Sequence, residues 1–252
     1  MLLSLNHLIT RTLEILKQEK KIFFIYTIIL TAITFLSKII FLLLANNTPS
    51  LLFLLIAAIA AVLSTSAVIM LIKQSDDLLN KTAKPIQTYT AYILPVLLPV
   101  LVITFLINIV RTFAFNVFLI QGIIFNTSLI QLGGAIIFII AAIIFGIWFA
   151  FIRQAMILDK RSIIQSFVYS KSLSKGRWLP VFGRIALMLI IVLVAQNIFE
   201  TIVNGIYSFF PYISSNILYT FLSLPKIFVQ ALTGVFIVIY FNILYRHLQK
   251  QP

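Results

Sequence analysis

RQAMILDKRSIIQSFVYSKSLSKGRWLPVFGR, residues 153–184, is the longest polar segment of the chain, and a long apolar run lies on each side of it. It contains seven of the nineteen lysines and arginines but only one acid, Asp159. Its middle is predicted to be helical, because Ser162 and Gln165 have the spacing of a capping box. Gly176 stands where a left-handed residue commonly ends a helix. We therefore predict a surface helix of a membrane protein.

One face of this predicted helix is apolar and consists of Ile163, Ile164, Phe167 and Val168. Trp178 follows, and tryptophan collects at membrane interfaces. We expect the helix to lie on a membrane with its apolar face at the acyl boundary. Basic residues beside that face are candidate contacts for anionic lipid. These candidates are Lys160, Arg161, Lys171, Lys175 and Arg177.

Seven residues of the segment, followed at once by an apolar run, form a pattern: Ser166, Phe167, Ser170, Leu173, Lys175, Gly176 and Gly183. In this pattern the chain resembles the membrane domain family of glycerophosphoryl diester phosphodiesterase and related bacterial inner-membrane proteins. That family has Ala-Leu where this chain has Ser166 and Phe167. The resemblance implies a six-span layout for the whole chain. The family is named after a catalytic domain fused to some members, which we do not expect here, so the resemblance implies no reaction.

The composition is that of a membrane protein. Hydrophobic residues make up 62% of the 252 residues and charged residues 10%, and the mean hydropathy is +1.12. These values lie outside the range of soluble domains. The net charge is +13, and the basic residues that produce it lie in short segments beside the apolar runs. This placement favours contact with lipid over binding of nucleic acid. Without cysteine, and with two histidines near opposite ends, the chain is expected to hold no metal and no cofactor.

We predict an all-α polytopic protein with one integral membrane domain, residues 1–252. Residues 1–19 have the pattern of an amphipathic helix, which lies either on the cytoplasmic surface or against another loop of the protein. Its apolar face would be Leu2, Leu5, Ile9, Leu13 and Leu16. Six apolar runs are long enough to span a bilayer. They are residues 22–44, 51–72, 92–110, 135–151, 185–206 and 226–245.

Asp76 and Asp77 follow the second predicted span, and Lys73 and Lys81 lie near them. A pair of carboxylates could bind a metal ion, but the neighbouring lysines favour a solvated polar loop. We therefore interpret this segment as a loop without a metal site.

The basic residues predict the orientation of the chain. With both termini in the cytoplasm, sixteen of the nineteen lysines and arginines lie on that side, and Lys38, Arg111 and Lys226 remain toward the outside. Such asymmetry follows the positive-inside rule. We predict a multi-pass protein of a bacterial cytoplasmic membrane with both termini inside.

Glu200 is the only acid inside a predicted span, with Gln196 and Asn204 four residues to either side. The bases predicted to lie in the same half of the membrane are Lys38, Arg111 and Lys226. In one interpretation these residues line an outward-facing cavity with a positive balance, suited to an anionic headgroup or a small anion. In the other, Glu200 pairs with one base and the amides join helices. The sequence leaves both interpretations open.

No catalytic motif stands out, so we expect a protein that is not an enzyme. The sequence favours a lipid-interacting or assembly-supporting membrane protein whose basic cytoplasmic face contacts anionic lipid. The alternative is a transporter or lipid-handling protein that uses the polar cavity around Glu200. Expected partners are membrane lipids and a membrane protein or a second copy of the chain, and no nucleic acid.

Overall fold

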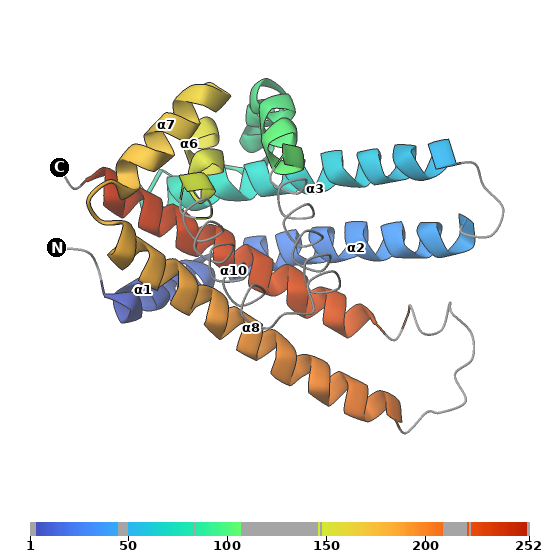
Figure 1. Ribbon diagram of the computed structural model, residues 1–252. Helices are drawn as coiled ribbons and strands as arrows, with labels where there is room; N and C mark the ends of the chain where they lie inside the picture. The colour runs from blue at the N-terminus through green and yellow to red at the C-terminus, as the bar shows by residue number, and fades with distance from the viewer. Residues whose placement is uncertain are drawn as a thin grey trace, which may run out of the picture. The chain divides into compact units, whose positions relative to one another are not determined.

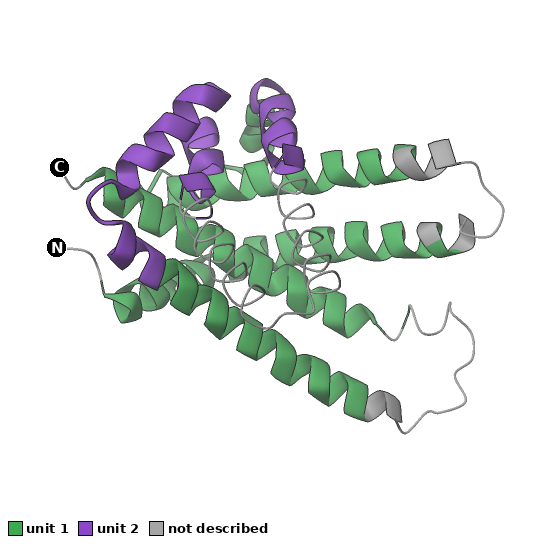
Figure 2. Ribbon diagram, in the orientation of Figure 1, with its two compact units in different colours: residues 1–93, 184–252 green, residues 94–183 purple. Residues whose placement is uncertain are grey.

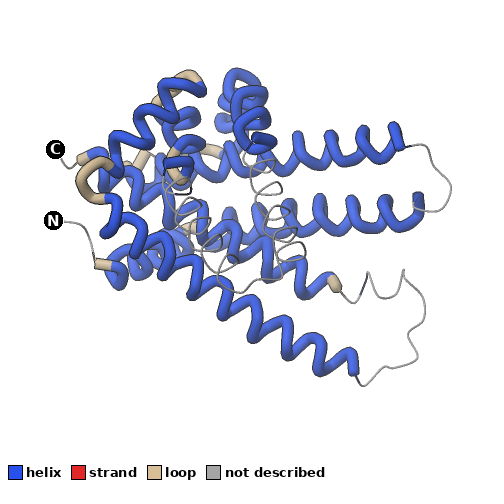
Figure 3. The backbone as a smooth tube through the Cα atoms, in the orientation of Figure 1, coloured by secondary structure: helices blue, strands red, loops and turns tan. Residues whose placement is uncertain are grey.

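The computed structural model describes residues 4–44, 50–82, 84–106, 146, 148–208, 221 and 223–250. Within these ranges every regular element is a helix, and no strand is present (Figure 1, Figure 3). A helix satisfies its backbone groups within one segment, which is why long apolar runs adopt it in a membrane. The predicted all-α class is confirmed.

The chain divides into two compact units (Figure 2). Unit 1 consists of residues 1–93 and 184–252, and unit 2 of residues 94–183. The first and last parts of the chain therefore fold together, and the basic segment, residues 153–184, belongs almost wholly to unit 2.

Unit 1 contains the long helices. They are α1 (Leu5–Gln18), α2 (Lys20–Leu44), α3 (Ser50–Leu79), the 3₁₀ helix η1 (Ile86–Tyr92), most of α8 (Trp178–Ser208) and α10 (Leu224–Gln249). Each of α2, α3 and α10 contacts the other two, and α1 contacts α10 (Figure 1). The interior of this bundle includes Tyr26 on α2, Ile69 on α3 and Tyr240 and Tyr245 on α10, all of which are fully buried. Its core lies toward the C-terminal ends of α3 and α10.

Helix α1 begins at a side-chain cap, in which the Ser4 hydroxyl accepts a hydrogen bond from the His7 N–H. Its buried residues are Leu8, Thr12 and Ile15. Leu13, on the predicted apolar face, is 43% exposed. One side of α1 therefore packs within unit 1, and contact of the remaining apolar side with a membrane surface stays a prediction.

Five helices of the described part are long and apolar enough to cross a membrane. They are Lys20–Ile40, Leu55–Leu79, Gln87–Leu106, Trp178–Gly205 and Leu224–Gln249. These five overlap five of the six predicted spans. The other predicted span, residues 135–151, lies largely outside the described residues.

The second of these helices differs from the prediction. Helix α3 continues to Leu79, seven residues past the expected end of the span, and carries Asp76 and Asp77 on its last two turns. Asp76 is 1% exposed and Asp77 6%. The interpretation of these residues as a solvated loop is wrong, because cationic side chains neutralise both carboxylates inside the bundle.

Candidate functional site

The basic segment folds into two helices of unit 2, α6 (Ile152–Leu158) and α7 (Ile163–Ser174), which contact each other. The predicted capping box is confirmed: the Gln165 N–H donates to the Ser162 hydroxyl, and the Ser162 N–H donates to the Gln165 side chain. Gly176 has a φ of +74°, which confirms the predicted left-handed residue after the helix. A residue with a side chain would be strained at that φ.

The buried side of α7 is made of serines. Ser166, Ser170 and Ser174 recur every four residues, and all three are buried. The Ser170 hydroxyl accepts a hydrogen bond from the Phe151 N–H, 3.3 Å away, just before α6. Small side chains let two helices approach closely, and this turns the larger side chains of α7 outward.

The predicted apolar face of α7 divides in the structure. Ile164 is 77% exposed and Val168 is 60% exposed, whereas Phe167 packs against the rings of Trp148 and Phe149. Ile163 is half-buried. Only part of the predicted face is therefore available for contact with a membrane.

Two lysines share the exposed side of α7 with Ile164 and Val168. Lys171 lies three residues after Val168 and therefore on the same side of the helix. Lys175, four residues later at the C-terminal cap, continues this spacing. Both lysines are exposed, and the Lys171 ammonium lies 4.4 Å from the centroid of the Trp148 ring. We call these four residues the basic–apolar face of α7.

The other predicted lipid contacts lie just before and just after α7 in the chain. Lys160 is exposed. Arg161 lies 3.7 Å from the Asp159 carboxylate, and its guanidinium is 3.7 Å from the centroid of the Tyr169 ring. Arg177 is half-buried. The positive charge that is most available for a ligand therefore comes from the three lysines.

The predicted membrane-embedded site lies between α8 and α10 in unit 1. Lys226 donates to the Glu200 carboxylate, and Gln196 donates to the Thr233 hydroxyl at 2.6 Å. Beside these contacts is a hollow of about 180 Å³ that includes Asn197 among its lining residues. The ion pair stands at the edge of this hollow, with side-chain exposures of 39% for Glu200 and 34% for Lys226.

Other residues predicted for this site are not part of the hollow. Lys38 on α2 and Asn204 on α8 are exposed and do not line it. Arg111 lies outside the described residues. Among its described lining residues the hollow has one acid, Glu200, and one base, Lys226.

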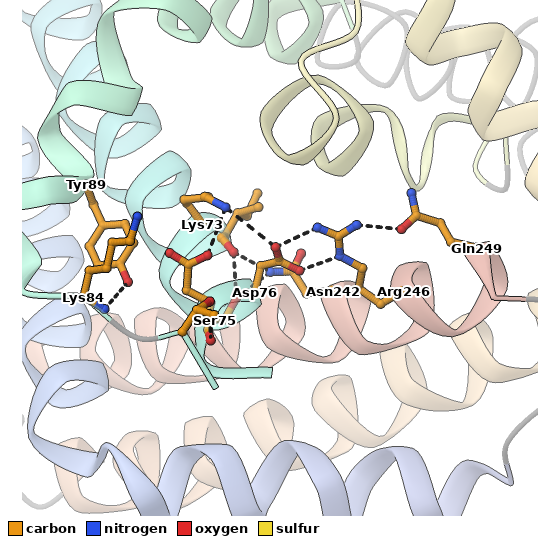
Figure 4. A network of polar contacts seen from close by, with 11 residues as sticks. Lys73, Ser75, Asp76, Lys84, Tyr89, Asn242, Arg246 and Gln249 are labelled. Atoms are coloured by element: carbon orange, nitrogen blue, oxygen red, sulfur yellow. Dashed lines mark hydrogen bonds and ion pairs between the residues drawn. The ribbon is translucent and has the colours of Figure 1, made fainter. Parts of the chain in front are cut away.

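The structure also contains a charged cluster that the sequence interpretation missed (Figure 4). Arg246 on α10 donates to both carboxylate oxygens of Asp76 on α3, at 2.5 and 2.7 Å. Lys73 lies 3.8 Å from Asp76 and 3.0 Å from Asp77. Asn242, on α10 one turn before Arg246, donates to the Ile72 carbonyl and to Ser75. Two acids and two bases balance here, and a bidentate arginine fixes α10 against α3.

A local signal for part of this cluster exists in the sequence. Lys73 and Asp77 have the i, i+4 spacing of a helical ion pair, which favours continuation of the helix beyond residue 72. No local signal identifies Arg246, which is 170 residues from Asp76.

The ion pair between Glu200 and Lys226 predicts how two substitutions at Glu200 affect stability. Glu200→Gln should change the free energy of unfolding by less than about 1 kcal/mol, because partly exposed pairs contribute little and the amide can still accept from Lys226. Glu200→Leu should lower the free energy of unfolding by about 1–3 kcal/mol, because it removes the carboxylate that accepts the hydrogen bond from the Lys226 ammonium. Unfolding in detergent micelles measures both. A Leu variant as stable as the parent would show that the pair contributes nothing to the fold.

The described residues contain no group of three or more histidines and carboxylates placed to hold a metal ion. They bring together two polar sites in unit 1 and one basic surface in unit 2. Comparison of the chain with protein families, curated proteins and solved structures found no match.

Proposed function

We propose that the protein is a six-span, non-enzymatic protein of a bacterial cytoplasmic membrane that binds anionic lipid through the segment around α7. The observation that carries the proposal is the basic–apolar face, where exposed Ile164 and Val168 stand beside exposed Lys171 and Lys175. The resemblance to the membrane domain of glycerophosphoryl diester phosphodiesterase agrees with this architecture.

A lipid surface suits this face better than water or a packed protein core. Lysine stems can lie along apolar surface while their ammonium groups reach phosphates at the level of the headgroups. Trp178 and Leu179, which follow α7 in the chain, are also exposed, by 53% and 60%. Tryptophan is enriched at the depth where acyl chains meet headgroups. The segment therefore has both components of an interfacial anchor, apolar area and positive charge.

The charge balance points to an anionic surface. Asp159 is the only acid among residues 94–183, and it lies beside Arg161. Among the described residues, no ion pair involves Lys160, Lys171 or Lys175. Each basic residue near an anionic membrane contributes roughly 1 kcal/mol of attraction.

A peptide of residues 159–178 provides a direct test. It should bind vesicles that contain phosphatidylglycerol, become helical when bound, and dissociate at about 1 M salt, where the Debye length is roughly 3 Å. A peptide with the same composition in scrambled order is the control. Equal binding to neutral vesicles would contradict the proposal, because the lysines would then contribute nothing to recognition.

The proposed orientation predicts the outcome of reporter fusions. Reporters after Lys81 and after Lys160 should read as cytoplasmic, because most of the basic residues lie on that side. A reporter inserted within residues 46–50 should read as external. An external reading at either lysine would contradict the six-span layout with both termini inside.

A further inference from the structure

The hollow between α8 and α10 combines opposite charges with free acceptor groups. We infer that it binds a small zwitterion, a headgroup or solute that carries a primary ammonium next to a phosphate. The inference rests on the proposed span layout only for the depth of the site, and it concerns a different surface from the basic–apolar face of α7.

The charges select a zwitterion over an anion. The Glu200 side chain is 39% exposed and that of Lys226 is 34% exposed beside the hollow, so a ligand can reach each of them. A simple anion would pair with Lys226 and leave the Glu200 carboxylate facing like charge. A zwitterion presents its ammonium to Glu200 and its phosphate to Lys226, so that both charges stay paired while the direct contact between the two side chains opens.

The amides of the hollow favour an ammonium that carries N–H groups. Gln196 and Asn197 use their NH₂ groups within the protein, to the Thr233 hydroxyl and to the Leu193 carbonyl. Their carbonyl oxygens remain available as acceptors, and both residues line the hollow together with Glu200, whose carboxylate is a third acceptor. A primary ammonium has three N–H donors, whereas a quaternary ammonium has none. The site should therefore distinguish ethanolamine from choline.

The position along the helices places the site near a membrane surface. Lys226 is the third residue of α10, and Glu200 stands eight residues before the end of α8 at Ser208. At about 1.5 Å per residue, Glu200 lies roughly 12 Å from that end. With the proposed layout this is the outer leaflet, close to its headgroups. Leu193, about two turns deeper than Glu200 on α8, supplies apolar contact of the kind that the first part of an acyl chain would make.

The test uses the full-length protein, purified in detergent and freed of lipid. Native mass spectrometry measures the binding of phosphatidylethanolamine and phosphatidylcholine, because an anionic lipid would also bind at α7. We expect phosphatidylethanolamine to bind about tenfold more tightly than phosphatidylcholine, which carries the same phosphate but has no N–H donor on its ammonium. Glu200→Gln and Lys226→Met should each abolish this preference, and Lys38→Met, which removes a lysine outside the hollow, should leave it unchanged. Thermal unfolding shows that each variant is folded.

Water-soluble phosphoethanolamine separates the two sources of the zwitterion. If phosphoethanolamine at millimolar concentration displaces the bound lipid, the occupant is a solute. If it does not, the occupant is a bilayer lipid. Both results are consistent with a zwitterion site. Equal binding of phosphatidylethanolamine and phosphatidylcholine to the parent protein would overturn the inference, as would a folded Glu200→Gln variant that keeps the preference. Neither result would affect lipid binding by α7, because its test uses anionic vesicles and a different segment.

Discussion

Replacing Arg246 with Met should lower the free energy of unfolding by about 3–5 kcal/mol, because it leaves the Asp76 carboxylate buried without its main counter-ion. Asp76 is 1% exposed, and the remaining cation, Lys73, is 3.8 Å away and lies closer to Asp77. Unfolding by sodium dodecyl sulfate in mixed micelles, followed by circular dichroism, measures the change.

Removing the acid of this pair should lower the free energy of unfolding less than removing the arginine does. Asp76→Asn removes the charge from the buried position, while the Arg246 side chain is 27% exposed and can turn toward a polar surrounding. We expect a loss of about 1.5–3 kcal/mol, the range for hydrogen bonds to charged groups. Adding Asp76→Asn to the Arg246→Met variant should recover part of its stability, because the uncompensated charge is then gone.

Arg11→Met is the matched control for Arg246→Met. Arg11 also donates to a carboxylate, that of Glu14 at 3.1 Å, but the two side chains are 42% and 49% exposed. The control should lose less than about 1 kcal/mol. If the Arg246 variant lost no more than this, the buried pair could not be what holds α10 against α3.

Changing Lys160, Lys171 and Lys175 together to Gln should reduce the preference for anionic lipid by roughly 100-fold. Three residues at about 1 kcal/mol each give about 3 kcal/mol, and 1.4 kcal/mol is a factor of ten. The chain has two tryptophans, so a Trp148→Phe background leaves Trp178 as the only tryptophan, three residues after Lys175. Quenching of Trp178 by brominated phosphatidylglycerol in mixed bilayers then reports the local enrichment of anionic lipid.

Arg161→Gln provides the comparison. Its charge is offset by Asp159 at 3.7 Å, and its guanidinium is stacked on Tyr169, so this variant should lose clearly less than one lysine substitution does. Unchanged quenching in the triple variant would mean that the basic–apolar face does not recognise lipid charge. Equal losses for Arg161→Gln and for Lys171→Gln would show that total charge, and not its exposed position, decides the binding.

The sequence by itself determined the helices and several local features. Long apolar runs predicted five helices that the structure describes, because such runs satisfy their backbone groups only as helices in a bilayer. The capping box of Ser162 and Gln165 and the left-handed Gly176 were also predictable, since both depend on residues within one or two turns. The sequence offered three bases as partners of Glu200 without choosing among them, and Lys226 is the one that contacts it in the structure.

Only the tertiary structure decided which charges meet across helices. Asp76 and Arg246 are separated by 170 residues, and their pairing depends on how α3 and α10 pack, which no local pattern encodes. The same packing turned a segment that looked like a solvated loop into a buried part of α3. Among the described residues, the arrangement of α8 and α10 brings one of the three predicted bases, Lys226, to the hollow beside Glu200. Within unit 2, contact between α6 and α7 makes Ser166, Ser170 and Ser174 the inner side of α7. Spacing along the chain fixes which side chains share a helix face, but the neighbouring helices determine which of those faces is buried.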